Sequence, residues 1–451
     1  MYLTQKFAAF IAGTNYGDLP EQVAGMAKER IMDTLGAAIA GSVNWEYAVQ
    51  LREACKKLGS GNCRVLGGEH CYPAAHAAMI NAAYAHSVEL DDGHKNAGCH
   101  AGAVVVPTAL TMAQALGKSG KELITAVALG YEVTYRIAAH VNPAQINKGF
   151  HPSSNCGAYG AAAVAGKLMG LNEEQLANAL GQAGMLASGT MEATKSGQRA
   201  KCVQVGNAAY NGILAATLAG SGMEGCLTAL EGPNGLFATQ SENVDVEAVC
   251  RDLGKVYTIG DTYNKMYPSC RHAQPGIEAA LELGTEHRID PDDVAAIRIG
   301  THRVAYELTG IIKEPKNSGE AKFSLAYGSA VALREHGFGV ASLTEKSYTD
   351  PETLRLADRV TCEIDPDVQA LFPQKRGAKV RIELKDGTVY EKELYDLKGS
   401  PGNPVGWEEL QAKFEANARA VLSDGQTDRL LHTLKRLEQL EDLAGLTELL
   451  P

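Results

Sequence analysis

Acid and base groups are concentrated in the short segment from His86 to His100, which lies between two stretches with helical periodicity. Within 15 residues it holds three carboxylates and three imidazoles, namely Glu89, Asp91, Asp92, His86, His94 and His100. Side chains of these types are the common proton donors and acceptors of enzymes. A solvated helix end and a metal site are two other interpretations, although the spacing matches no common set of metal ligands. The pattern favours proton transfer.

A second cluster, Gly149–Gly157, places His151 directly before a Pro-Ser-Ser sequence that opens a stretch rich in Gly and Ala. This stretch predicts a helix, and the free N–H groups and positive dipole at a helix N-terminus suit a carboxylate. A lone histidine is more often structural than catalytic, but an imidazole beside an anion site is well placed for proton transfer. Because its reference pKa is about 6.5, His151 is our candidate for the catalytic base.

Two further clusters supply positive charge. Three cations stand in the segment Lys195–Lys201, which by itself could be a solvated loop, and the segment Asn264–His272 includes Lys265 and Arg271. The latter lies where a helical half of the chain gives way to a mixed half, and domain junctions commonly form ligand clefts. We expect Lys201, Lys265 and Arg271 to bind the carboxylates of a small anionic substrate, Arg271 with two parallel hydrogen bonds.

Composition narrows the classes of partner. The formal net charge of −11 argues against a nucleic-acid partner, which needs a basic face, although a local group of cations can reverse the potential in one cleft. No apolar run reaches the roughly 18 residues of a membrane span, and no export signal opens the sequence, so we expect a cytoplasmic protein. The GxGxxG match at Gly220–Gly225 follows a helix rather than a strand, so no dinucleotide cofactor is expected.

Helices must position the first three clusters, because helical periodicity dominates the first 258 residues. Gly-containing breaks separate the helices, and few segments alternate with a period of two. Asn172 is the expected N-cap of one helix, and Gly41 is the expected end of another. The pattern predicts helices over residues 20–40, 73–88, 104–116, 121–140, 158–169, 173–186, 208–219 and 244–252.

Strand-like segments begin after Tyr257. Residues 294–299 alternate, and the segments 379–384 and 389–394 flank Lys385-Asp386-Gly387-Thr388, which is typical of a hairpin turn. These segments predict a small antiparallel sheet covered by helices on one side. Helices are predicted over residues 276–284, 323–334, 351–359, 407–422 and 428–440.

The helices after residue 403 are expected to return to the helical body. We therefore predict a mainly α fold in two domains. Residues 1–258 and 403–451 form a large all-helical domain, which is discontinuous in the sequence, and residues 259–402 form a smaller α+β lid domain.

Five segments, in their order along the chain, resemble the MmgE/PrpD superfamily. They are HSVELDDGH, which includes Glu89, GFHPSSNCGAYGAAA, which includes His151, the Lys201 segment that runs into GNAA, KMYPSCRH, and AKFSLAYGSAVAL, which includes Lys322. The resemblance spans the chain from about Pro20 to about Leu440. Together the segments are specific for the superfamily and much less specific for the reaction.

The resemblance implies a large helical domain, a smaller α+β lid, a cleft between them, and a homodimer. Known members of the superfamily include 2-methylcitrate dehydratase, cis-aconitate decarboxylase and iminodisuccinate epimerase. They share a proton transfer next to a carboxylate of a di- or tricarboxylate, and they require no metal. The resemblance therefore implies an enzyme without a cofactor or metal.

The site residues of the superfamily match particular positions here. Its acidic loop corresponds to Glu89–Asp92, and the His that ends the loop corresponds to His100. The His of its GFHP segment, the Lys before GNAA and the Lys that opens the KxxPxC segment correspond to His151, Lys201 and Lys265. Together with the charge pattern, this correspondence predicts catalytic roles for His151, Asp91, His100 and Lys201, with Asp91 or His100 as the acid. It predicts substrate-binding roles for Lys265, Arg271, His272, Asp92, His94 and Lys322.

Four positions depart from relatives. Many relatives have Asp where Glu89 stands and His where Gln274 stands, and cis-aconitate decarboxylase has a functional His at Cys270 and an essential Tyr near Thr309. The loss of that His and Tyr argues against cis-aconitate decarboxylation. The sequence thus favours a hydro-lyase of the 2-methylcitrate dehydratase type. An epimerase of an iminodisuccinate-like acid, a cis-aconitate-type decarboxylase and an inactive binding or structural homologue are the alternatives.

Overall fold

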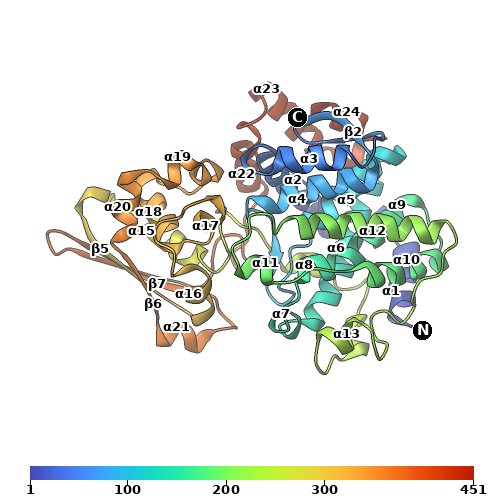
Figure 1. The fold of residues 1–451 in the computed structure, drawn as a ribbon, viewed down its shortest axis with the longest axis horizontal. Helices are drawn as coiled ribbons and strands as arrows, with labels where there is room; N and C mark the ends of the chain where they lie inside the picture. Colours follow the sequence, from blue (N-terminus) through green and yellow to red (C-terminus); the bar gives the residue numbers. More distant parts are fainter.

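The structure is a computed structural model that describes residues 1–451. Most of its helices form one large helical body, and a four-stranded sheet lies in a small lobe at its side (Figure 1). Each part has its own hydrophobic core. One core has 87 buried residues, from Leu3 to Ile259 and again from Val405 to Leu446, and the other has 25, from Ala273 to Ile382. None of the helices combines the length and apolar character that a membrane span needs.

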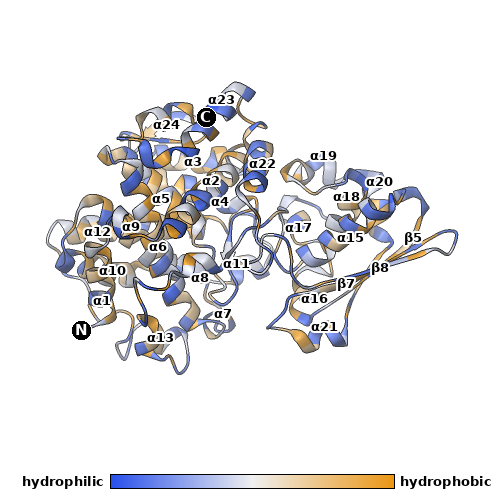
Figure 2. Cartoon of the chain, turned by 180° about the vertical axis from the view of Figure 1, so that it is seen from behind, coloured by the Kyte–Doolittle hydropathy of each residue, from blue (hydrophilic) through white to orange (hydrophobic).

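The helical body contains seventeen α-helices. They are α1 (Leu3–Gly13), α2 (Glu21–Asn44), α3 (Ala48–Lys56), α4 (Ala74–Ser87), α5 (Gly102–Leu116), α6 (Gly120–Val141), α7 (Ala144–Asn147), α8 (Pro152–Asn155), α9 (Gly157–Met169), α10 (Glu173–Leu186), α11 (Glu192–Lys195), α12 (Val203–Gly220), α13 (Leu236–Gln240), α14 (Val246–Val249), α22 (Trp407–Ala418), α23 (Asp424–Lys435) and α24 (Ala444–Leu449). The central helices α5 and α9 are rich in hydrophobic residues (Figure 2). The helices that carry the sequence clusters therefore pack around an apolar interior.

Helix prediction from periodicity succeeds in the body. The helix expected over residues 173–186 is confirmed as α10, and the Asn172 side chain caps it by accepting a hydrogen bond from the N–H of Gln175. The helices α4, α5, α6 and α9 agree with their predicted ranges to within two residues at each end. The helix expected over residues 244–252 was wrong in length, because only Val246–Val249 is helical and Asp252 already has a positive φ of 55°.

Gly41 does not end its helix, contrary to the prediction, since α2 continues to Asn44. A Cβ at Gly41 would lie 2.6 Å from the Ser87 hydroxyl oxygen and even closer to the carbonyl oxygen of Tyr84. The glycine therefore lets α2 and α4 approach each other closely. This contact matters for the site, because α4 ends where the acidic segment begins.

The body is not entirely helical, which corrects the predicted all-helical domain. The strands β1 (Cys63–Val65) and β2 (Gly68–Tyr72) form an antiparallel hairpin, and β3 (Gly93–His94) pairs with β4 (Thr262–Tyr263). These strands have only two to five residues, which is too few for a clear alternation of polar and apolar residues. The pairing of β3 with β4 brings the acidic segment beside the segment that carries Lys265.

The small lobe packs its helices against a mixed sheet. Its strands are β5 (Val294–Thr301), β6 (Val360–Ile364), β7 (Ala378–Leu384) and β8 (Val389–Leu394), in the order β6-β5-β7-β8. Its helices are α15 (Gln274–His287), α16 (Arg303–Thr309), α17 (Ser318–Lys322), α18 (Leu325–Glu335), α19 (Glu345–Tyr348), α20 (Pro351–Asp358) and α21 (Pro366–Leu371). Across the whole chain, 3-10 turns cover Tyr16–Asp18, Thr258–Asp261, Pro291–Asp293, Val340–Leu343 and Leu437–Gln439.

The predicted purely antiparallel sheet was wrong in one strand. The β7–β8 hairpin forms as expected, and β5 pairs with β7 in antiparallel register. However, β6 pairs with β5 in parallel register, from Ile297 opposite Val360 to Thr301 opposite Ile364. Parallel strands need a long crossover, and the helical segment from α16 to α20 supplies it. The five residues of β6 directly follow the helix predicted over residues 351–359, so no separate strand pattern was visible for them.

The C-terminal helices pack on the helical body. Leu410 and Phe414 of α22 belong to the large core, and Gly36 of α2 lies directly against the Phe414 ring. The exact boundaries predicted at residues 258 and 403 stay a prediction.

A Gly41→Ala variant tests the close contact between α2 and α4. The added Cβ overlaps the Tyr84 carbonyl, so we expect a loss of about 1–3 kcal/mol in the free energy of unfolding. Urea unfolding measures this loss. The matched control is Gly25→Ala in the same helix, where a Cβ meets no atom within 4 Å and the better helix propensity of Ala stabilises the fold. Equal stability of the two variants would contradict the packing argument.

Candidate active site

The acidic segment begins with a strained turn. Directly after α4, Glu89 has a φ of 54°, in the left-handed region that side chains other than Gly seldom adopt. Such a conformation persists only where surrounding contacts hold it. Glu89 and Asp91 are both buried, and both make ion pairs. The turn thereby holds two carboxylates inside the body.

Glu89 joins three distant parts of the chain. One carboxylate oxygen accepts a short hydrogen bond from the Lys201 ammonium, and the other accepts one of 2.8 Å from Lys265. These partners lie 112 and 176 residues away in the sequence. Burial acts to raise the pKa of Glu89, but the charges of Lys201 and Lys265 outweigh it and hold this pKa well below its usual value. Glu89 is therefore an ionised bridge between two cations.

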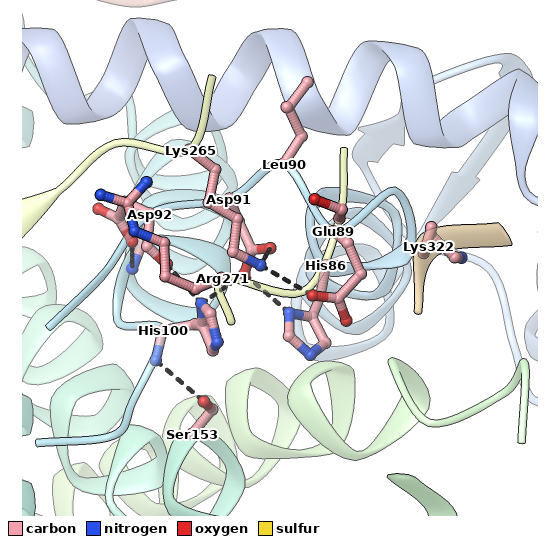
Figure 3. Close-up of polar contacts among 12 residues, drawn as sticks. His86, Glu89, Leu90, Asp91, Asp92, His100, Ser153, Lys265, Arg271 and Lys322 are labelled. Atoms are coloured by element: carbon pink, nitrogen blue, oxygen red, sulfur yellow. Dashed lines mark hydrogen bonds and ion pairs between the residues drawn. The ribbon is translucent and has the colours of Figure 1, made fainter. Parts of the chain in front are cut away.

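Asp91 faces two imidazoles (Figure 3). Its Oδ2 lies 2.7 Å from Nδ1 of His86 and 3.5 Å from Nδ1 of His100. Although burial acts to raise the pKa of Asp91, its interactions with His86 and His100 lower this pKa overall. The carboxylate is thereby suited to accept hydrogen bonds from the imidazoles, and its predicted role as the acid stays a prediction.

The predicted base, His151, lies beside the same group. It is the N-cap residue of α8, and its ring centroid is 6.1 Å from that of His86. Burial, together with the charges of His86 and Lys201, lowers the pKa of His151 well below its usual value. Its Nδ1 is buried without a hydrogen-bond partner. The imidazole is therefore neutral and able to accept a proton.

His100 is held in one tautomer. Its Nδ1 lies within hydrogen-bond distance of the carbonyl oxygen of Asp92, which can only accept, so Nδ1 carries the proton. Its backbone N–H donates to the Ser153 hydroxyl at 2.9 Å (Figure 3). Burial lowers the pKa of His100 to about 4. His100 is thus neutral near pH 7 and can accept a proton on Nε2, and its predicted role as the acid stays a prediction.

A cavity of about 250 Å³ opens beside these groups, between the helical body and the small lobe. Its polar lining includes His86, Lys201 and Lys322, and its apolar lining includes Ile312 and Phe323. Lys322 donates a hydrogen bond of 2.7 Å to the carbonyl oxygen of Ser87. Burial lowers the pKa of Lys322, and Lys201 acts in the same direction. The charged residues of the lining are the cations Lys195, Arg199, Lys201 and Lys322 and the carboxylates Glu307 and Glu320, so positive charge is in excess around the cavity.

Two family models cover most of the chain. The MmgE/PrpD N-terminal domain matches residues 5–248, and the MmgE/PrpD C-terminal domain matches residues 267–439. The chain belongs to the MmgE/PrpD family. The resemblance seen in the sequence is therefore confirmed. Within the family, the chain is 29% identical over 463 residues to cis-aconitate decarboxylase of Homo sapiens, covering 99% of this chain and 94% of that protein. The enzyme of the same name from Aspergillus terreus is also 29% identical, over 462 residues, covering 96% of this chain and 92% of that protein.

Four of the predicted site residues of this MmgE/PrpD chain make contacts away from the Glu89 and Asp91 pairs. Asp92 accepts hydrogen bonds from the Gly102 N–H and the Tyr131 hydroxyl, and the His94 ring packs at 4.7 Å on Tyr135. Their contacts are with the interior of the body. A substrate-binding role for Asp92 and His94 therefore gains no support from the geometry.

Arg271 and His272 are also held elsewhere. Arg271 donates to the side chains of Gln274 and Ser400 at 2.6 Å each, and Nδ1 of His272 lies 3.4 Å from Nε2 of His302. Sequence spacing places these residues near Lys265 but does not determine the direction of their side chains. Their predicted contact with substrate also lacks support, whereas Lys265 and Lys322 do join the charged groups.

Three of the four positions that depart from relatives lie outside the charged group. Cys270 is buried, and its N–H donates to the carbonyl oxygen of Lys322 at 3.0 Å. The Thr309 hydroxyl donates to the carbonyl oxygen of Ala305 within its own helix, at 2.8 Å. Gln274 holds Arg271 and also donates to the carbonyl oxygen of Tyr267. None of these three side chains forms an ion pair or hydrogen bond with the charged groups around Glu89.

A buried network that supports the acidic segment was missed by the sequence analysis. The Lys413 ammonium lies 2.6 Å from Asp33 and donates to the carbonyl oxygen of Leu90 at 2.9 Å. Asp33 in turn accepts a hydrogen bond of 2.7 Å from Asn264, the residue before Lys265. A signal was present, because Lys413 lies on the same face of α22 as the buried Leu410. A lysine on an apolar helix face usually has a buried partner.

His86 was also missed as a site residue, although it belongs to the acidic segment. It lies in the last turn of α4, five residues before Asp91, so a helix end and a short turn bring the two side chains together. Sequence analysis could have found it from this spacing. The structure shows no group of three or more His, Cys, Asp or Glu side chains arranged to hold a metal ion.

The buried network predicts that Lys413→Met destabilises the protein by about 3–5 kcal/mol, because Asp33 is left as an uncompensated buried charge. Urea unfolding measures the loss. Lys435→Met, at an exposed position of α23, is the matched control. Adding Asp33→Asn to the Lys413→Met variant removes the unpaired charge and should recover part of the stability. If the single variant is as stable as the control, the network does not support the fold.

We expect the buried Asp92 to make the free energy of unfolding depend on pH. Burial raises its pKa from 3.8 to about 6, so between these values the folded chain holds a proton that the unfolded chain has lost. The contribution of Asp92 to stability is therefore greatest below pH 4 and falls as the pH rises through 6, by about 3 kcal/mol in total. Asp92→Asn lacks this titration. We expect the stability of the wild type relative to Asp92→Asn to fall between pH 4 and pH 7, as measured by urea unfolding, and parallel pH curves would contradict the assignment.

Proposed function

We propose that this chain is a lyase that acts on a small di- or tricarboxylate by transferring a proton at a carbon next to a carboxylate. The observation that carries the proposal is the cavity lined by His86, Lys201 and Lys322, with the ionised Glu89 and Asp91 behind it. A hydrogen next to a carboxylate is weakly acidic, so its transfer needs a positioned base and cations for the developing charge. The imidazoles and the ammonium groups are suited to these two tasks.

Decarboxylation of a cis-aconitate-like acid is the reaction that we place first. Relatives that match this chain over nearly their whole length carry the name cis-aconitate decarboxylase, in organisms as distant as Homo sapiens and Aspergillus terreus. This places a carboxy-lyase ahead of the hydro-lyase that the sequence analysis favoured. In such a reaction the C–C bond to one carboxylate breaks, CO₂ leaves, and a proton from the enzyme forms the new C–H bond.

Dehydration is the second candidate, and a structural observation favours it. Cys270 and Thr309 stand where the decarboxylase has a functional His and Tyr, and neither side chain makes a hydrogen bond to the charged groups around Glu89. Proton transfer here would therefore depend on the imidazoles of the body alone. A base that removes a proton and an acid that protonates a β-hydroxyl would then form a C=C bond. Epimerisation and an inactive homologue are further outcomes that the experiment below distinguishes.

The remaining features expected from the sequence complete the proposal. The two hydrophobic cores support a helical domain of residues 1–258 and 403–451 and a lid of residues 259–402, with the cavity between them. A homodimer, a cytoplasmic location and a reaction without metal or cofactor stay predictions. Chelation tests the last of these, because a metal-free lyase keeps its activity in EDTA.

Incubation in D₂O with cis-aconitate, citrate or 2-methylcitrate, followed by proton NMR and CO₂ measurement, tests the function. Decarboxylation releases CO₂ and places deuterium at the new C–H position, whereas dehydration gives a vinyl signal without CO₂. Deuterium exchange without either product indicates epimerisation. We expect CO₂ from the cis-aconitate-like acid. No exchange and no product with any of these acids would count against a lyase for this substrate class.

Two lysine variants, one in the cavity and one at an exposed position as its control, accompany that experiment. Lys201→Met removes an ammonium group from the cavity, so we expect kcat/KM to fall by about 10²–10³-fold. Lys346→Met changes an exposed lysine of α19 and should leave kcat/KM unchanged. Equal rates for the two variants would show that Lys201 does not bind the substrate.

A further inference from the structure

We propose that His86, oriented by Asp91, is the residue that transfers the proton in the cavity. The inference rests on the proposed function and deepens it. It moves the role of base or acid away from His151 and makes Asp91 a positioning residue. The assignment follows from the contacts on the two nitrogens of His86.

Asp91 fixes one side of the imidazole. Nδ1 of His86 lies 2.7 Å from Oδ2 of Asp91, and both side chains are almost completely buried, with exposed fractions of 1% and 0%. An ionised carboxylate only accepts hydrogen bonds, so Nδ1 carries a proton and donates it to Asp91. Nε2, on the opposite side of the ring, is then the nitrogen that gains or gives up a proton. A carboxylate on Nδ1 also stabilises the imidazolium that forms when Nε2 gains a proton.

The nitrogen on the other side of the ring has no partner within the protein. Nε2 of His86 is buried and makes no hydrogen bond, and His86 is one of the residues that line the cavity. Lys201 and Lys322 line the same cavity, so carboxylates bound by their ammonium groups lie beside the His86 residue. A buried polar atom without a partner is rare and points to a function. Here a substrate carbon or hydroxyl is the partner that fits.

The other two imidazoles are less well placed. Their ring centroids lie 5.2 Å (His100) and 6.1 Å (His151) from that of His86, and neither residue is among those that line the cavity. Nδ1 of His100 is directed to the Asp92 carbonyl. The titratable groups around His86 are Asp91, Glu89, His100, His151, Lys201 and Lys322.

The chemistry balances in both candidate reactions. In decarboxylation, the electron pair of the breaking C–C bond moves into the conjugated system, CO₂ leaves, and the proton on Nε2 of the His86 imidazolium forms the new C–H bond. The neutral imidazole then regains a proton from water. In dehydration, the neutral Nε2 takes the proton next to the carboxylate, the C–H electron pair forms the C=C bond, and the hydroxyl leaves as water after gaining a proton from a second donor, which solvent water supplies.

Substitution of His86 tests the inference by activity. We expect His86→Ala to lower kcat by about 10²–10⁴-fold with little change in KM, and added imidazole to restore part of the rate. His76→Gln, on the same helix but with its ring against Tyr210, should keep the wild-type rate. Asp91→Asn removes the charge that stabilises the imidazolium, so it should lower kcat and shift the pH profile toward lower pH. A wild-type rate in His86→Ala, or imidazole rescue only in His151→Ala, would overturn the assignment.

A measurement that needs no turnover separates this inference from the proposed function. In the intact protein labelled with ¹⁵N-histidine, the His86 signal is identified by its loss in His86→Gln. We expect the tautomer with the proton on Nδ1, a loss of this preference in Asp91→Asn, and a shift of the Nε2 signal on addition of tricarballylate, a stable tricarboxylate. If no acid turns over but this signal responds, the proposed reaction fails, whereas the orientation of His86 by Asp91 and its contact with a bound carboxylate stand. A ring protonated on Nε2 but not on Nδ1, or no response to tricarballylate, overturns the inference.

Discussion

The site depends on one carboxylate that bridges two ammonium groups. Glu89 adopts a left-handed backbone conformation and holds Lys201 and Lys265, which reach it from positions 112 and 176 residues later in the sequence. Neither lysine could be buried without a counter-charge, and a buried carboxylate would be equally unfavourable alone. Glu89 and Lys265 therefore stabilise each other's ionised state, and Lys201 acts on Glu89 in the same direction. Through these ion pairs, the acidic segment His86–His100 is joined to the loop before α12 and to the segment that carries Lys265.

This arrangement explains how an acidic protein presents a positive cavity. The carboxylates lie behind the lysines and imidazoles, where they fix positions and protonation states, while Lys201, Lys322 and His86 line the space for a ligand. The net charge of −11 is a property of the whole surface and says little about this interior. A tricarboxylate that enters meets cations held in place before it arrives, so binding requires little reorganisation.

The sequence predicted those features that depend on neighbouring residues. The helices of the body and the β7–β8 hairpin were predicted, because periodicity and turn chemistry are local signals. Dense charge likewise pointed to Lys201 and Lys265, which join the same carboxylate, while their roles and that of His151 stay predictions. The prediction failed where the answer depends on packing. The directions of Arg271 and His272, the parallel pairing of β6 and the pairing of Lys413 with Asp33 result from contacts between distant segments. His86 was overlooked because its proposed role depends on the contacts of its two ring nitrogens.

The return of the C-terminal helices to the body has a consequence for biosynthesis. Lys413, on α22, supports the Leu90 carbonyl between the two ionised carboxylates of the site. During translation Lys413 is added 323 residues after Leu90. The acidic turn is therefore synthesised long before it gains this internal support. A nascent or truncated chain without α22 would contain every imidazole of the site and still lack the contacts of Lys413 with Asp33 and Leu90.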